Sequence, residues 1–193
     1  MALDEVALVK NLPGGSDQSW ERYQKGQRYQ LTSLANATAL TTGAITANRL
    51  YAIPFLVSGT HTYTKIGIYV GTLSAGNVRL GIYNNLDGDV YPGALLLDAG
   101  VVDVGSTGLK EVVISLQLQP GLYWLALGGS STPTLRAIAV AGAMPILGLD
   151  NAFNTTPGIG WYVAFTYAAL PNPFTGGGTV QTAAQPAIAL LKQ

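Results

Sequence analysis

The sequence predicts an all-β protein, an antiparallel, jelly-roll-like β-sandwich that follows an extended N-terminal arm. Short runs of aliphatic, aromatic and β-branched residues recur along the chain, and Gly, Pro and Asn separate them. Helical periodicity is nearly absent. No segment offers the helical crossover of about a dozen residues that parallel strands need, so the strands are expected to pair antiparallel, as in a sandwich or jelly roll.

The charged residues divide the chain into two regions. Residues 1–30 hold eight of the twenty charged residues, and the rest of the chain holds twelve. We therefore assign residues 1–44 to an N-terminal arm and linker that serves as a docking segment, and residues 45–193 to the sandwich. Within the arm, Ser19 is a candidate cap for a short helix that reaches Tyr29.

The first three strands of the sandwich are predicted over residues 50–57, 62–70 and 77–83. Pro54 places the first strand at an edge or beside a bulge, because proline donates no hydrogen bond. Alternation in the second strand places Tyr63 on the face away from the core. The residues expected to face the core in the second and third strands are Thr64, Ile66, Ile68, Val70, Val78, Leu80 and Ile82.

The second half of the chain continues the pattern of strands and turns. A turn-rich loop over residues 84–93 leads into an extended stretch over 94–104. Further strands are predicted over residues 112–118, 122–127, 135–140, 161–167 and 187–191. Alternation in the first two of these adds Ile114, Leu116 and Trp124 to the expected core.

Composition excludes several classes of function. The chain has no Cys and one His, so disulfides, thiolate nucleophiles, Cys-based zinc sites and multi-His metal sites are excluded. The formal net charge is zero, which gives no overall attraction to nucleic acid or to an anionic membrane. The N-terminus is acidic where a secretory signal is basic, and no apolar run reaches the length of a spanning helix. We expect no catalytic residues, no metal, no cofactor and no membrane insertion.

Three local motifs each allow a structural and a functional interpretation. The segment Asn84–Asp89 is rich in oxygen ligands, but it lacks the bidentate Glu of a calcium loop, so a tight turn is favoured over a calcium site. His61 has no nucleophile or orienting carboxylate near it in sequence, and a loop or surface histidine is favoured over a general base. Residues 176–178 are three glycines that do not join a strand to a helix, so they are a connection rather than a phosphate loop.

Aromatic residues supply the candidate contact sites. Trp161 and Tyr162 follow a loop rich in Gly and Pro, and they are the candidates for stacking on a sugar, against the alternative of core or interface packing. The arm combines aromatic and arginine side chains, which are enriched at protein interfaces. Its interface candidates are Trp20, Arg22, Tyr23, Arg28 and Tyr29. A solvated tail is the alternative interpretation of the arm.

The sandwich region is poor in charge for its size. Soluble domains usually keep about a quarter to a third of their surface positions charged. We therefore expect much of its surface to be covered by copies of the chain or by other partners. The alternative is that Thr, Ser, Asn, Gln and Gly make the surface polar enough.

Four segments follow one another in a distinctive order: NRLYAIPF (48–55), KIGIYV (65–70), VRLGIYNN with YPGALLLDAGVVDV (78–104), and LQPGLYWLAL (118–127). In this order they resemble a β-sandwich module of tailed-bacteriophage structural proteins, often found in tail-fibre or other virion-associated proteins. The resemblance implies a non-enzymatic virion component, either a short tail fibre or a capsid decoration (cement) protein. It also implies a homo-oligomer, for which a trimer is expected, and contacts with other virion proteins. A carbohydrate-binding adhesin that recognises a host surface glycan is the alternative.

Overall fold

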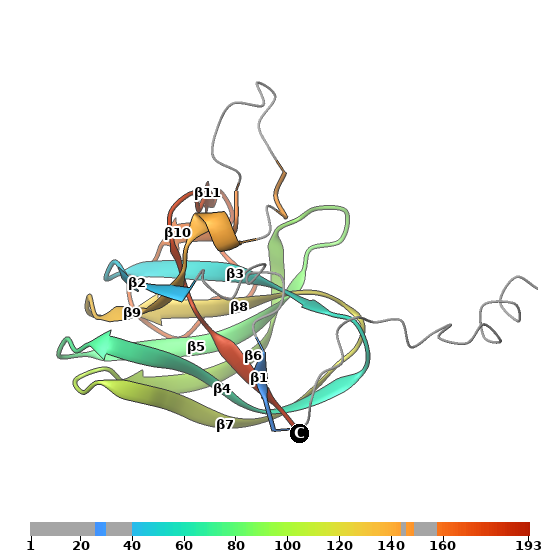
Figure 1. The fold of residues 1–193 in the computed structure, drawn as a ribbon. Helices are drawn as coiled ribbons and strands as arrows, with labels where there is room; N and C mark the ends of the chain where they lie inside the picture. Colours follow the sequence, from blue (N-terminus) through green and yellow to red (C-terminus); the bar gives the residue numbers. More distant parts are fainter. Residues whose placement is uncertain (1–25, 30–39, 144–145, 149–157) are drawn as a thin grey trace, which may run out of the picture.

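The protein is built from two antiparallel β-sheets that pack against each other, which confirms the predicted all-β sandwich (Figure 1). The computed structural model describes residues 26–29, 40–143, 146–148 and 158–193. A single 3-10 turn, Val140–Gly142, is the only helical element in these ranges. None of the described segments forms a helix with the length and apolar character to cross a membrane.

The six-stranded sheet contains the strands with the most continuous apolar sequence. Its order is β11-β10-β3-β8-β5-β6, and every neighbouring pair is antiparallel. Its strands are β3 (Arg49–Val57), β5 (Asn77–Asn85), β6 (Pro92–Asp103), β8 (Gly121–Gly129), β10 (Trp161–Ala164) and β11 (Thr179–Val180).

The seven-stranded sheet has a branched order. Its path is β1-β13-β4-β9-β12, with β7 paired to β4 and β2 paired to β9. Its strands are β1 (Arg28–Tyr29), β2 (Leu40–Ala44), β4 (His61–Thr72), β7 (Gly108–Leu118), β9 (Thr134–Ile138), β12 (Gln185–Pro186) and β13 (Ala189–Lys192).

The central strands are paired in a nested order, which is the topology of a rolled-up hairpin. Strand β3 pairs with β8, β4 pairs with β7, and β5 pairs with β6. The roll also brings β5 against β8 in the same sheet. Nested antiparallel pairs divided between two sheets define a jelly roll, so the jelly-roll-like class follows from the pairing itself.

The main core lies between the two sheets. Among the residues expected there, Ile66, Ile68, Leu80, Ile82 and Ile114 are buried. Leu116, also expected in the core, is only partly buried and packs against its margin. Its strand, β7, pairs on one side only within the described residues, so its side chains are less enclosed.

The predicted orientation of Tyr63 is wrong. Against β13 the register of β4 moves two residues, from Lys65 to Tyr63, while β13 moves only one, from Leu191 to Lys192, so Thr64 is an extra residue in β4. This bulge turns Tyr63 into the core, where it is fully buried and meets the Phe55 ring edge-on at 5.8 Å, while Thr64 is only partly buried.

A second buried cluster lies on the other face of the six-stranded sheet. Trp124 is fully buried as predicted, but it belongs to this cluster and not to the core between the sheets. Burial on both faces explains why β3 and β8 are apolar at nearly every position instead of at alternate ones. The other buried members are Leu50, Ala52, Tyr83, Ala126, Val163, Leu170 and Phe174.

The expectation that Pro54 marks an edge strand or a bulge is wrong for the strand as a whole, because β3 lies between β10 and β8 and pairs with β8 without a register shift. Pro54 lies beyond the part of β3 that pairs with β10. The register of β10 covers only residues 49–52 of β3. The proline therefore occupies a place where the neighbouring strand has ended, which is a local edge within an inner strand.

Two short strands precede residue 45 and pair with the seven-stranded sheet. Strand β1 pairs with β13, and β2 pairs with β9. Sheet pairing therefore extends into the range assigned to the arm and linker. Of the segment considered for a short helix, residues 26–29 form a turn and β1, and the remainder lies outside the described residues.

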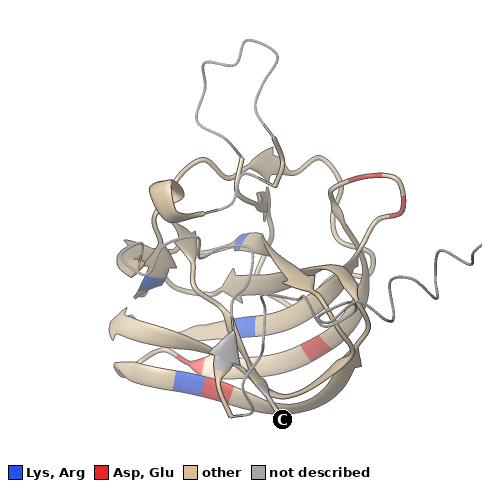
Figure 2. Ribbon diagram, turned by 45° about the vertical axis from the view of Figure 1, so that its right-hand side comes forward, with Lys and Arg blue, Asp and Glu red and all other residues tan. Residues whose placement is uncertain are grey.

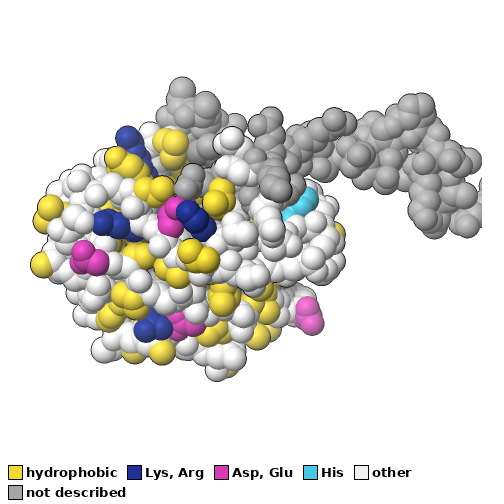
Figure 3. Space-filling model, turned by 90° about the horizontal axis from the view of Figure 1, so that it is seen from below, with side chains coloured by type: hydrophobic (Ala, Val, Ile, Leu, Met, Phe, Trp, Pro, Cys, Tyr) yellow, Lys and Arg dark blue, Asp and Glu magenta, His cyan; other side chains and the backbone are white. Residues whose placement is uncertain are grey.

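Apolar side chains are exposed along the β7 side of the sandwich. Val113 and Leu109 on β7 are 78% and 48% exposed, and Tyr69 on the adjacent β4 is 46% exposed. Leu109 lies directly opposite Tyr69, and these three residues are named the β7 patch below. Charged residues are few along the described part of the ribbon (Figure 2). Strand β7 lies at the bottom of Figure 1, and Figure 3 shows the molecule from that side. Hydrophobic side chains are scattered there among the few charged ones.

Adjacent residues of β7 provide a test of the strand register. Ile114 is buried and Val113 is exposed. We expect Ile114→Ala to lower the free energy of unfolding by about 2–5 kcal/mol through lost burial and a residual cavity. Val113→Ala should cost less than about 1 kcal/mol, because only strand propensity is lost. Denaturant unfolding of both variants measures the difference, and equal effects would show that the register is wrong.

Candidate functional site

A cleft opens where the loop after β5 meets residues 173–177. Its volume is about 350 Å³, within the range of small-molecule sites. Its walls combine two aromatic rings, two prolines, a leucine, one carboxylate and glycine backbone, and we call it the aromatic cleft. The residues that line it are Leu86, Asp89, Tyr91, Pro92, Gly93, Pro173, Phe174, Gly176 and Gly177.

Tyr91 is held rigidly in the wall of the aromatic cleft. Its hydroxyl donates to the carbonyl of Thr175 at 2.7 Å and accepts from the amide of Gly178 at 2.9 Å. Its ring meets Trp161 at 5.0 Å and Phe174 at 5.8 Å between centroids, both edge-on. Burial raises the pKa of Tyr91 and the charge of Asp89 adds to this, while the Gly178 hydrogen bond opposes them. A fixed ring of this kind loses little entropy when a ligand stacks on it.

The loop over residues 86–91 is closed by its own side chains. The Asn85 amide nitrogen donates to the carbonyls of Leu86 and Asp89, at 2.9 and 2.6 Å. Its oxygen accepts from the Trp124 indole at 2.9 Å, which ties the loop to the second buried cluster. One oxygen of Asp89 accepts from the amide of Val90. These bonds are those of a closed turn, the interpretation favoured for this segment.

No metal-binding cluster is seen in the part of the chain that the structure describes. A group of three or more His, Asp or Glu side chains does not occur there. His61 begins β4, and its ring lies edge-on to Tyr63 at 6.4 Å.

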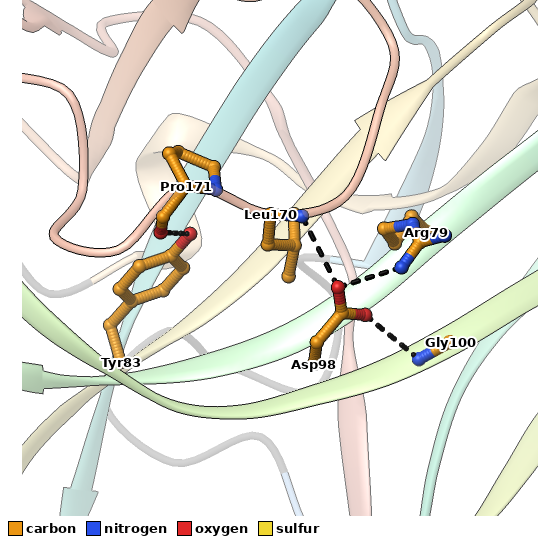
Figure 4. Close-up of polar contacts among 6 residues, drawn as sticks. All are labelled: Arg79, Tyr83, Asp98, Gly100, Leu170 and Pro171. Carbon is orange, nitrogen blue, oxygen red and sulfur yellow. Dashed lines mark hydrogen bonds and ion pairs between the residues drawn. The ribbon is translucent and has the colours of Figure 1, made fainter.

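Asp98 fastens the opposite wall of the cleft to the six-stranded sheet (Figure 4). One carboxylate oxygen accepts from Arg79 at 2.6 Å and from the amide of Leu170 at 3.2 Å, and the other accepts from the amide of Gly100 at 3.1 Å. This interaction fixes the point at which the segment leading to Pro173 and Phe174 crosses β5 and β6.

Tyr83 attaches the next residue of the same segment, Pro171, to the six-stranded sheet. Its hydroxyl donates to the carbonyl of Pro171 at 2.8 Å (Figure 4). Burial raises the pKa of Tyr83, and the charge of Asp98 raises it further, so the hydroxyl keeps the proton that it donates. Gly81 lies beneath the segment, where a Cβ atom would collide with the Leu170 side chain. The sheet is therefore shaped to receive this segment.

Further hydrogen bonds carry the segment along β6. The amide of Leu95 donates to the Asn172 side chain at 3.0 Å, and the amide of Phe174 donates to the carbonyl of Gly93 at 2.9 Å. Residues 172–174 thus cover the first part of the β6 edge and bring Phe174 against Tyr91 and Tyr83.

The two residues expected to stack on a sugar point to opposite faces of β10. Trp161 packs on Tyr91, and its indole donates to the carbonyl of Val90 at 2.8 Å, so it supports the aromatic cleft from behind. Tyr162 faces Tyr51, at 6.3 Å between ring centroids, on the side of the core between the sheets. The pair does not form one platform because successive strand residues alternate between faces.

The arm candidates contribute little to the described structure. Trp20, Arg22 and Tyr23 lie outside the described residues. The backbone of Arg28 and Tyr29 forms β1.

The sequence did not predict that Tyr91, Phe174 and Asp89 line one cleft. The turn-rich loop and the segment around Pro173 were both visible, but nothing local joins residues more than eighty positions apart. The glycine run was interpreted only as a connection, yet two of its members line the aromatic cleft and the third donates to Tyr91.

No protein-family model matches the chain, and no curated protein matches it.

Proposed function

We propose that this protein is a non-enzymatic structural component of a bacteriophage particle, which self-associates through its sandwich and attaches by its N-terminal arm. The resemblance of four ordered segments to phage virion modules supports the virion role. The β7 patch is the observation that supports self-association. A short tail fibre and a capsid decoration protein both agree with these features, and the resemblance favours a trimer.

The β7 patch has the character of a surface that a second copy covers. Within the described residues, β7 pairs only with β4, so one long edge of the strand is left open. Edge strands of monomers are usually protected by charge, proline or a bulge. Glu111 is neutralised by Lys65 at 3.2 Å beside the patch, and Val113 stands 78% exposed. A second copy would bury the apolar side chains and could pair with the edge of β7 that faces no described strand.

A charge placed in the β7 patch should disrupt self-association. We expect Val113→Lys to convert the oligomer into a monomer, because the lysine would have to lose its hydration in the interface. Leu40→Lys is the matched control, since Leu40 is 50% exposed on β2, which is separated from β7 by β9 and β4. Sedimentation velocity of both variants tests this. A monomeric unmodified chain at micromolar concentration would refute the self-association.

The arm can be removed without touching any described strand. Deletion of residues 1–25 ends before β1, so we expect a folded sandwich that still self-associates. The shortened chain should fail to enter particles assembled from the other virion proteins. Its position and occupancy in imaged particles measure this, and normal incorporation would remove the docking role of the arm.

Glycan binding is the second candidate function, and the aromatic cleft favours it. A fixed tyrosine ring, a nearby carboxylate and exposed glycine backbone are groups that can stack on a sugar ring and hydrogen-bond to its hydroxyls. Such binding would make the sandwich an adhesin that contacts the host surface.

Two neighbouring aspartates allow a controlled test of this second function. Asp89 lines the aromatic cleft, and Asp87 is an exposed residue of the same loop that does not. If a host glycan binds there, Asp89→Asn should weaken it by roughly tenfold or more through loss of a charge-assisted hydrogen bond, whereas Asp87→Asn should not. Glycan-array binding of the three chains gives the answer, and the absence of any bound glycan would exclude the adhesin.

A further inference from the structure

A second cleft lies at one end of the sandwich, between the two sheets. It encloses about 150 Å³ between β2 and β9 on one side and β3 on the other, and residues 181–186 close it. Small residues leave this space open, and the polar side chains that line it are Arg49, Tyr51, Gln181 and Thr46. The remaining lining residues are Gly43, Ala44, Ile45, Ala137, Ala183, Ala184 and Pro186. We call it the Arg49 cleft.

Arg49 is a cation with no acidic partner among the described residues. Its guanidinium carbon lies 4.1 Å from the centroid of the Tyr162 ring and 5.8 Å from that of Tyr51. By contrast, Lys65 and Arg79 each form an ion pair with a carboxylate. The guanidinium is planar and carries five N–H donors, and its position over the rings limits the directions in which they point. No hydrogen bond to a described residue uses the donors of Arg49.

Tyr51 offers a second donor in the same cleft. Its side chain is 4% exposed, and its hydroxyl oxygen accepts from the amide of Thr46 at 2.9 Å. The hydroxyl proton remains available for an acceptor in the cleft. The Gln181 amide donates to the carbonyls of Ala183 and Ala184, at 3.2 and 3.1 Å, and this fixes the loop that closes the cleft.

We infer that the Arg49 cleft binds a carboxylate group, which Arg49 holds through its planar guanidinium and Tyr51 through its hydroxyl. A carboxylate matches the fork of an arginine in shape and charge. No second cation lines the cleft, so a doubly charged phosphate would stay half-neutralised there. The volume admits a small group and not a whole sugar or nucleotide. The carboxylate has two sources: a small free acid, or the α-carboxyl at the end of a protein chain.

The binding can be read on Arg49 itself. In the full chain, titration with sodium acetate should shift the side-chain Nε–H resonance of Arg49 in a saturable manner, and sodium chloride at equal ionic strength should not. In the Arg49→Gln variant, the resonances of the other residues that line the cleft should no longer shift saturably with acetate. Arg136→Gln is the matched control, because Arg136 also lies over a tyrosine ring, that of Tyr69, outside the cleft.

Two conservative variants keep the test independent of folding. Arg49→Lys retains the charge but loses the planar fork, and Tyr51→Phe retains the ring but loses the hydroxyl. Each should weaken acetate binding by roughly tenfold. If only a short peptide with a free α-carboxyl binds, and its amidated form does not, a chain end is the source. Equal shifts with chloride, or no saturable response to either acetate or the peptide, would overturn the inference.

Discussion

Both faces of the six-stranded sheet are apolar, and the rest of the architecture follows from the need to cover them. The seven-stranded sheet covers one face and forms the main core. The other face carries Trp124 and Tyr83, and the segment that contains Leu170 and Phe174 closes over them. A jelly roll of two bare sheets leaves such a face to the solvent. The cost of exposing these large side chains therefore fixes the path of the chain after β10.

Polar contacts determine where that covering segment lies. Asp98 receives the amide of Leu170, and Tyr83 donates to the carbonyl of Pro171. Because Arg79 neutralises Asp98, the carboxylate can remain at a partly buried position without an unpaired charge. The aromatic cleft is a consequence of this arrangement, since it forms where the fastened segment meets the loop after β5.

The sequence allowed the strands to be predicted better than the site. Alternation placed Ile66, Ile68, Leu80 and Ile82 in the core because each local stretch has one clear apolar face. It failed for Tyr63, because a bulge against β13 adds one residue to β4 and reverses the faces before Lys65. For Trp124 alternation gave the burial but not the cluster, since both faces of β8 are apolar. The aromatic cleft joins Tyr91 to Gly178 across 87 positions, and no local period encodes such a contact.

The few charges of the sandwich also explain why the β7 side has little charge to protect its edge. Arg79 and Asp98 are used to fasten the covering segment, and Lys65 and Glu111 neutralise each other. Lys110 donates to the Ser106 hydroxyl at 2.6 Å, which holds its side chain beside its own turn and leaves its charge in place. β7 therefore carries one charge that no described carboxylate neutralises, whereas natural monomers protect such edges with charge, proline or a bulge. An edge with so little charge favours pairing with another copy. The same scarcity of carboxylates leaves Arg49, the first residue of β3, and Arg136 over tyrosine rings and without an acidic partner among the described residues.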